Sequence, residues 1–253
     1  LCLLALSGCQ LLPANPDTDN VEAVIAANPP PQPPSRNFDS DTLYDLLLAE
    51  LAGQRQQPAL ALQRYQRQVQ QAHSPLVAER AFQIAEYMDE RGAALASALT
   101  WVRLAPDSAE AHRAAALELA KTGQFTQALE HTSQSITLDP DSESHFDFIA
   151  YTATHAAPAM RAALLDEFEQ LLRQHPQRNE LRLGQAILLQ EEHPEQALSL
   201  LQHMPGESSI PALALQARLL QQLDQPEQSL IVQQQLLDQQ PDNNLIRLNY
   251  ARQ

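Results

Sequence analysis

Eight histidines and two pairs of acidic residues are the side chains of this 253-residue chain that could do chemistry. Histidines serve as metal ligands or general bases, but none here falls in a His-Glu-x-x-His pattern or a Cys/His cluster. The pairs Asp139/Asp141 and Glu191/Glu192 fall at predicted turns or helix ends, where carboxylates act as caps. The sequence has no Gly-x-Ser-x-Gly motif and no glycine-rich phosphate loop. We therefore expect no enzymatic activity, no metal site and no cofactor.

The charge balance narrows the range of partners. The chain carries 31 acidic against 16 basic residues, a net charge of −15, and Lys121 is its only lysine. Such a surface repels phosphate backbones and anionic lipid headgroups. We expect protein partners and no nucleic acid.

A repeat of about 34 residues organises the chain. With 6 Gly and 6 Phe among 253 residues, the composition predicts an all-α fold. The segments "ERGAALASALTWVRLAPDS" and "KTGQFTQALEHTSQSITLDPDS" align at an offset of 34, which matches Ala94 with Ala128 and Pro106 with Pro140. Further turn prolines follow at Pro176 and Pro241, and the 65 residues between them predict one more pair, whose second helix stops early at Pro205-Gly206.

This pattern resembles the tetratricopeptide repeat (TPR), a pair of helices with small residues where they cross. The best copy spans 109–142 and the next best 210–243, and weaker copies span 42–74, 75–108 and 143–178. The resemblance implies a superhelical solenoid of about six helical pairs over 38–253, which then enters a further repeat. We expect Tyr65 and Trp101 in its core and Ala128 at a helix crossing.

The N-terminal 37 residues differ from the rest of the chain. Leu6-Ser7-Gly8-Cys9 resembles the lipobox of bacterial lipoproteins, which implies that 1–8 is the remnant of a signal peptide and that Cys9 is lipidated. Residues 9–37 are proline-rich and predict a disordered tether. By the sorting logic of that family, Gln10 favours the outer membrane, facing the periplasm. The alternative is that the apolar run begins a core helix.

The TPR resemblance also implies where partners bind. First helices of such arrays line a concave groove, so their outward residues are candidates for recognition, with exposure without a role as the alternative for each. The groove candidates are Glu110, Arg113, Leu117, Lys121, Asp147, Tyr151 and Arg218. They do not make the paired Lys/Asn arrangement with which some TPR domains clamp a peptide carboxylate.

The first helix, "DSDTLYDLLLAELAG", is apolar over much of its circumference. We expect the stripe at Leu43, Leu47 and Leu51 to pack on the following helix around Leu62 and Tyr65. The excess apolar surface predicts docking into a groove on a partner. Candidate contacts are Leu43, Tyr44, Leu46 and Leu48. Alternatively, the tether covers this surface through Val21, Val24 and Ile25.

Anchor, tether and acidic repeats together resemble bacterial outer-membrane TPR lipoproteins. Within that group the layout is similar to adaptors that bring a periplasmic C-terminal processing protease together with cell-wall hydrolases. A pilotin or an outer-membrane-protein assembly lipoprotein is the main alternative, and the front half of a cell-wall enzyme is another. We expect the natural protein to continue beyond Gln253.

Overall fold

The computed structural model describes residues 39–141 and 144–251. The chain divides into two units, Leu1–Asp39 and Ser40–Gln253, and the second holds all the helices described below. Cys9, the predicted signal remnant at 1–8 and the predicted tether at 9–37 lie outside the described residues. Their roles remain predictions.

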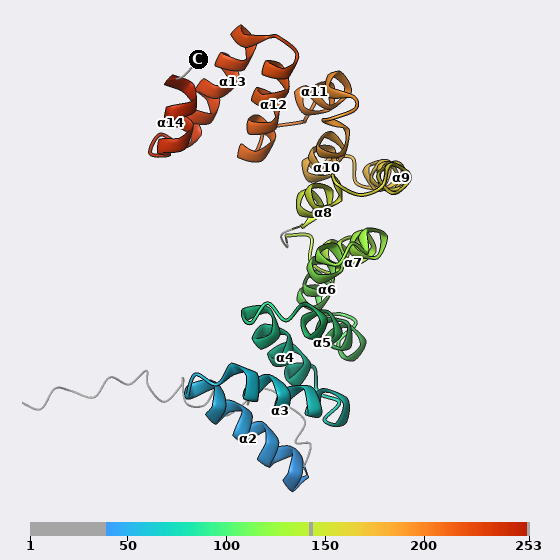
Figure 1. The fold of residues 1–253 in the computed structure, drawn as a ribbon. Coiled ribbons are helices and arrows are strands. Elements are labelled where there is room, and N and C mark those ends of the chain that lie inside the picture. Colours follow the sequence, from blue (N-terminus) through green and yellow to red (C-terminus); the bar gives the residue numbers. More distant parts are fainter. Residues whose placement is uncertain (1–38, 142–143, 252–253) are drawn as a thin grey trace, which may run out of the picture. The chain divides into compact units, whose positions relative to one another are not determined.

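The described part of the chain consists of helices joined by short turns (Figure 1). The predicted all-α fold is confirmed, and no strand occurs in 39–141 or 144–251. In chain order the helices are α2 (Ser40–Gln54), α3 (Pro58–Gln71), α4 (Pro75–Tyr87), α5 (Arg91–Leu104), α6 (Ala109–Lys121), α7 (Phe125–Leu138), α8 (Phe146–Ala153), α9 (Pro158–Gln174), α10 (Asn179–Leu189), α11 (Pro194–Gln202), α12 (Ile210–Gln222), α13 (Pro226–Gln239) and α14 (Asn244–Ala251).

The local sequence explains where several helices begin and where the chain turns between the helices of a pair. Proline opens α3, α4, α9, α11 and α13, where its missing N–H costs nothing. In four pairs, the turn between the two helices contains one residue in the left-handed region, with φ between 55° and 78°. Those residues are Gln56, Asp89, Gly123 and Asp224. Only one of the four is glycine. The position in the repeat therefore predicts this turn better than the residue type does.

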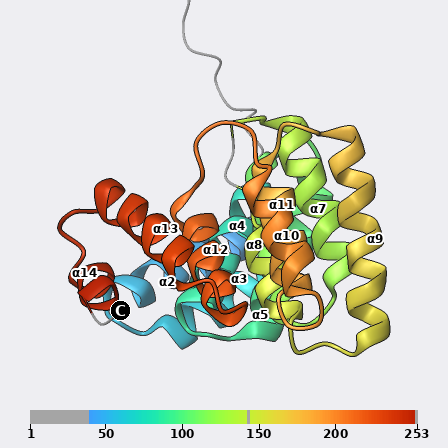
Figure 2. The same cartoon turned by 90° about the horizontal axis from the view of Figure 1, so that it is seen from above.

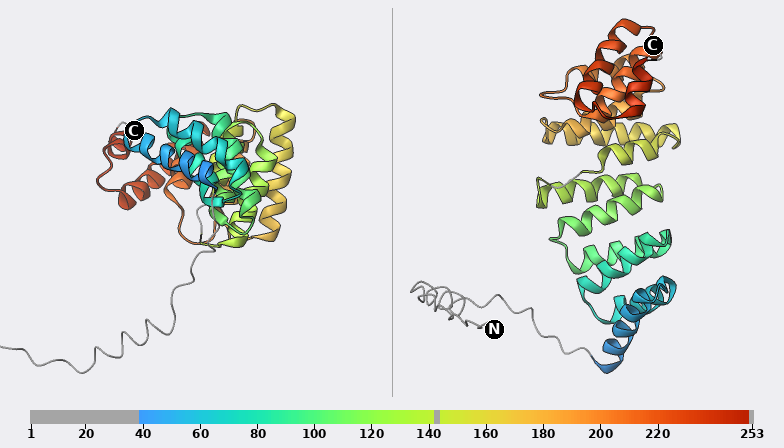
Figure 3. Two further views of the ribbon diagram at one scale, coloured as in Figure 1. Left: turned by 90° about the horizontal axis from the view of Figure 1, so that it is seen from below. Right: turned by 90° about the vertical axis from the view of Figure 1, so that its left-hand side faces the viewer.

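Consecutive helices pack in antiparallel pairs, and each pair packs on the next (Figure 3). Contacts join α2 to α3, α4 to α5, α6 to α7 and α12 to α13, and also α3 to α4 and α5 to α6. Alanines at the crossings are fully buried, among them Ala128 as predicted. Tyr65 and Trp101 are buried as expected, at 6% and 5% exposure. Small residues let the helix backbones approach, and larger ones fill the remaining spaces.

The pair formed by α8 and α9 departs from this scheme. α8 has 8 residues and α9 has 17, and α8 packs mainly on α10. Phe146 of α8 and Phe168 of α9 are fully buried, with ring centroids 6.0 Å apart in an edge-on arrangement. α9 consequently lies outside α8 and α10, beside α7 (Figure 2).

One expectation about α2 is wrong. Leu43, Leu47 and Leu51 were expected to pack on α3, but they are 49%, 57% and 48% exposed. The buried face of α2 is instead formed by four small or polar residues: Thr42, Asp45, Ala49 and Ala52. The alanines permit close approach to α3, and this helix has its main contacts with that single neighbour.

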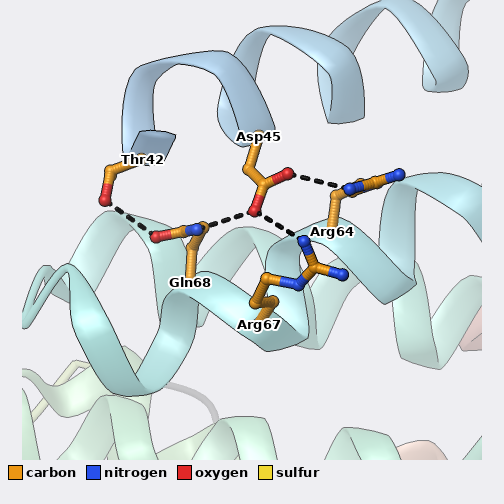
Figure 4. A network of polar contacts seen from close by, with 5 residues as sticks. All are labelled: Thr42, Asp45, Arg64, Arg67 and Gln68. Atoms are coloured by element: carbon orange, nitrogen blue, oxygen red, sulfur yellow. Dashed lines mark hydrogen bonds and ion pairs between the residues drawn. The ribbon is translucent and has the colours of Figure 1, made fainter. Parts of the chain in front are cut away.

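A polar network joins the buried face of α2 to α3 (Figure 4). The Asp45 carboxylate accepts from Gln68 Nε2 at 2.8 Å and from Arg64 Nη1 at 3.0 Å, with Arg67 Nη1 at 3.4 Å. Thr42 Oγ1 donates to Gln68 Oε1 at 3.0 Å. The hydrogen bond from Gln68 and the charges of Arg64 and Arg67 lower the pKa of Asp45, and burial opposes them. The carboxylate is therefore held ionised within the helix interface.

Candidate protein-binding groove

A pocket of about 270 Å³ opens between α4 and α6. It is formed by the first helices of two consecutive pairs, with one side chain from α5 and one residue just before α8. Its lining residues are Phe82, Gln83, Glu86, Trp101, Glu110, Arg113, Ala114, Leu117 and His145. The pocket therefore joins side chains separated by more than 60 positions in the sequence.

We call the apolar part of the lining, Phe82, Trp101, Ala114 and Leu117, the floor of the pocket. Phe82 and Trp101 are 7% and 5% exposed, and their ring centroids lie 6.2 Å apart with the planes tilted by 39°. Leu117 and Ala114 of α6 complete the floor. Aromatic rings held by core packing offer apolar contact area at little entropic cost, so this floor suits an apolar side chain of a ligand.

The rim of the pocket carries both signs of charge. Arg113 lies 3.9 Å from Glu110, one turn away on α6. Lys121 Nζ lies 2.6 Å from the buried Glu118 and 3.6 Å from Glu86 of α4, so it connects the two first helices. A rim with both donors and acceptors can hydrogen-bond the backbone and polar side chains of an extended peptide.

The structure brings only some of the predicted groove residues together. Glu110, Arg113 and Leu117 line the pocket. Lys121 does not line it but forms an ion pair with the lining residue Glu86. The other three candidates lie elsewhere on first helices and do not line this pocket. Asp147 is half-buried on α8, Tyr151 is exposed on α8, and Arg218 is exposed on α12.

Six lining residues were missing from the groove candidates: Phe82, Gln83, Glu86, Trp101, Ala114 and His145. The repeat offset could have found Gln83, because it stands 34 positions before Leu117. Trp101, expected only in the core, both packs there and lines the pocket. Nothing in the sequence indicates that Trp101 also lines a pocket, because an aromatic residue on a second helix ordinarily belongs to the core.

The predicted contacts on α2 lie on a different surface from the pocket. Leu43 and Tyr44 are 49% and 64% exposed, whereas Leu46 and Leu48 are half-buried. With Leu47 and Leu51 they leave much of this helix apolar and accessible. Their binding role remains a prediction.

Histidines meet in one place. Nδ1 of His112 on α6 lies 2.9 Å from Nδ1 of His131 on α7, and His112 Nε2 lies 3.1 Å from the Pro106 carbonyl oxygen. Because that carbonyl can only accept, His112 Nε2 carries the proton of this hydrogen bond. Across 39–141 and 144–251 there is no group of three or more His, Cys, Asp or Glu side chains that could hold a metal ion. No helix in that part of the chain is long and apolar enough to cross a membrane.

A curated relative covers almost the whole chain. It is the TPR repeat-containing protein PA4667 of Pseudomonas aeruginosa, 38% identical over 252 residues. The match includes 98% of this chain and 42% of that protein. The chain folds as a TPR-type helical solenoid. The 34-residue offset and the helical pairs of the structure agree with this assignment.

Solved structures resemble the TPR array at low sequence identity. A tetratricopeptide repeat protein from Parabacteroides merdae is 13% identical, with a TM-score of 0.47 over 92% of this chain and 89% of that one. PilW, described as a type IV pilus biogenesis factor, is 13% identical with a TM-score of 0.48 over 83% and 99%. No protein-family model matches the chain.

Proposed function

We propose that this TPR array is a protein-binding scaffold whose pocket between α4 and α6 receives an extended segment of a partner. The observation that carries the proposal is the combination of a rigid aromatic floor with a rim of mixed charge on neighbouring first helices. An apolar side chain of the segment would rest on Phe82 and Trp101. Glu110 and Arg113 would pair with its polar groups.

We further propose that the array acts as an adaptor at the outer membrane. Lipidation of Cys9 would hold it there, and α2 would contact a periplasmic C-terminal processing protease through Leu43 and Tyr44. The pocket would then hold the cell-wall hydrolase on which the protease acts. Support for this arrangement comes from the lipobox-like Leu6-Ser7-Gly8-Cys9 and from the separation of α2 from the pocket on the array.

Site-specific photocrosslinking tests the pocket. A benzophenone amino acid replaces Gln83, an exposed residue of the pocket lining, in the otherwise natural full-length protein within cells. Irradiation should yield an adduct with a discrete protein, identified by mass spectrometry. Leu117→Glu, which places a charge on the apolar floor, should abolish that adduct.

The matched control places the same photoreactive group at Gln127, an exposed residue of α7 outside the pocket. No adduct of the same mass should form from this position. Identical adducts from both positions, or an adduct at Gln83 that survives Leu117→Glu, would contradict binding in the pocket.

A further inference from the structure

A second pocket, of about 370 Å³, lies between α7 and α9. Both are second helices of their pairs, so this pocket shares no residue and no helix with the one between α4 and α6. Figure 2 shows α7 and α9 side by side, outside α8 and α10. Its lining residues are Thr126, Leu129, Glu130, Ser133, Gln134, Glu167, Gln170 and Leu171.

The mixture of apolar and polar side chains in this lining suits an amphipathic group. Leu129 of α7 and Leu171 of α9 are buried and half-buried apolar side chains. Thr126, Ser133 and Gln170 add hydroxyl and amide groups to the same lining. An alkyl stem would be covered by the two leucines, while its polar end would find acceptors around it.

Two carboxylates in the lining have no Arg or Lys within ion-pair distance in 39–141 or 144–251, although the charge of one, Glu130, acts on the neighbouring His131. The buried acids Asp45 and Glu118 are each paired with an Arg or Lys at 3.0 Å or less. Glu130 and the half-buried Glu167 are in no ion pair within the same described ranges. Burial raises the pKa of Glu167, the hydrogen bond from Thr126 opposes this, and the charge of Glu130 raises it further. A cation entering the pocket would relieve both effects.

The geometry points to a binding site for one Arg or Lys side chain of a partner protein, received between Glu130 and Glu167 with its alkyl stem on Leu129 and Leu171. The net charge of −15 attracts such a basic partner over longer distances. Guanidinium and ammonium groups donate several hydrogen bonds, and the lining offers them two carboxylates and neutral oxygens. This site goes beyond the proposed function, because it lies on the second helices and would engage a different part of a partner.

Methyl NMR on the full chain tests the site with a defined probe. The peptide acetyl-Gly-Arg-Gly-amide is titrated into protein labelled at leucine methyls, in parallel with the same peptide carrying citrulline, which is neutral and nearly isosteric. We expect saturable shifts at Leu129 and Leu171 with the arginine peptide and none at Leu117 in the other pocket. The citrulline peptide should bind about tenfold more weakly or worse, equivalent to ~1.4 kcal/mol.

Two double variants distinguish binding at this site from nonspecific attraction to an acidic surface. Glu130→Gln with Glu167→Gln keeps size and hydrogen-bonding capacity and should abolish the shifts. Asp166→Asn with Glu191→Gln removes the same charge from exposed positions outside the lining and should leave them. Equal losses in both double variants, equal binding of the citrulline peptide, or shifts at Leu117 in place of Leu129 would each overturn the site. Failure of this site would not contradict binding in the pocket between α4 and α6, which shares no residue with it.

Discussion

The ring of Phe168 in α9 lies directly against the backbone of Gly184 in α10. A Cβ added at Gly184 would stand 2.8 Å from Cζ of that ring and nearer still to Cε1. The ring is fully buried and packs edge-on against Phe146, so it has little room to move. The position of α9 therefore depends on the absence of a side chain at this one residue.

Gly184→Ala should destabilise the protein by about 1 to 3 kcal/mol, because the methyl group overpacks the space that Phe168 fills. Urea unfolding monitored by circular dichroism measures the change. Gly92→Ala in α5 is the matched control, since a Cβ there meets nothing within 4 Å. It should be neutral or stabilising by about 0.4 to 1 kcal/mol.

Phe168→Leu provides a second test of the same contact. In the double variant with Gly184→Ala, the smaller side chain should remove part of the clash. The cost of Gly184→Ala should then be smaller in the Phe168→Leu background than in the natural protein. Additive costs would show that the two residues are not coupled.

Ala128 marks the register of the repeat. It is fully buried where α7 crosses its neighbours, so Ala128→Leu should lower the free energy of unfolding by roughly 1 to 3 kcal/mol. Gln124 is exposed just before α7, and Gln124→Leu should change stability by no more than about 0.5 kcal/mol. Thermal melts of both variants compare the two sites, and equal losses would refute the assigned register.

Asp45 should make stability sensitive to acid. Its pKa in the folded protein lies below the ordinary value of 3.8, so the unfolded chain binds its proton first as the pH falls. Its contribution is complete above pH 3.8 and is lost as the pH falls from there through the lower folded pKa. Urea midpoints between pH 2.5 and about 6 should fall less steeply in Asp45→Asn than in the natural protein, and Asp166→Asn should not change the slope.

The exposed side chains of α2 should be replaceable without loss of fold. Tyr44→Glu with Leu47→Glu alters two residues that are 64% and 57% exposed, so each change should cost no more than about 0.5 kcal/mol. Under the adaptor proposal the same variant should lose binding to the purified protease, measured by calorimetry. A drop of several degrees in melting temperature, with binding retained by the folded fraction, would assign these side chains to the core.

The predicted anchor is tested at Cys9. Cys9→Ala removes the thiol that would be acylated, so the variant should leave the membrane fraction while its melting temperature stays the same. Fractionation followed by a high-salt wash measures this. Retention of the variant in washed membranes would contradict lipidation at this residue.

The sequence alone determined the helical, TPR-repeat nature of this protein. Local chemistry that repeats about every 34 residues predicts several features of the structure. These are the helices that begin at prolines, the turns at Pro106 and Pro140, and the burial of Ala128. These features can be predicted from one sequence because each repeat chiefly contacts its neighbours along the chain.

Only the tertiary structure decided which face of α2 is buried and which residues share a pocket. Hydrophobicity favoured Leu43, Leu47 and Leu51 for burial, but close approach of α2 to α3 selected Ala49 and Ala52 instead. Likewise Phe82 and Trp101 of one helical pair line the same pocket as His145, which precedes α8, through packing that no local pattern encodes. Burial depends on the shape of the neighbouring helix as well as on residue type, and that shape is set by contacts distant in sequence.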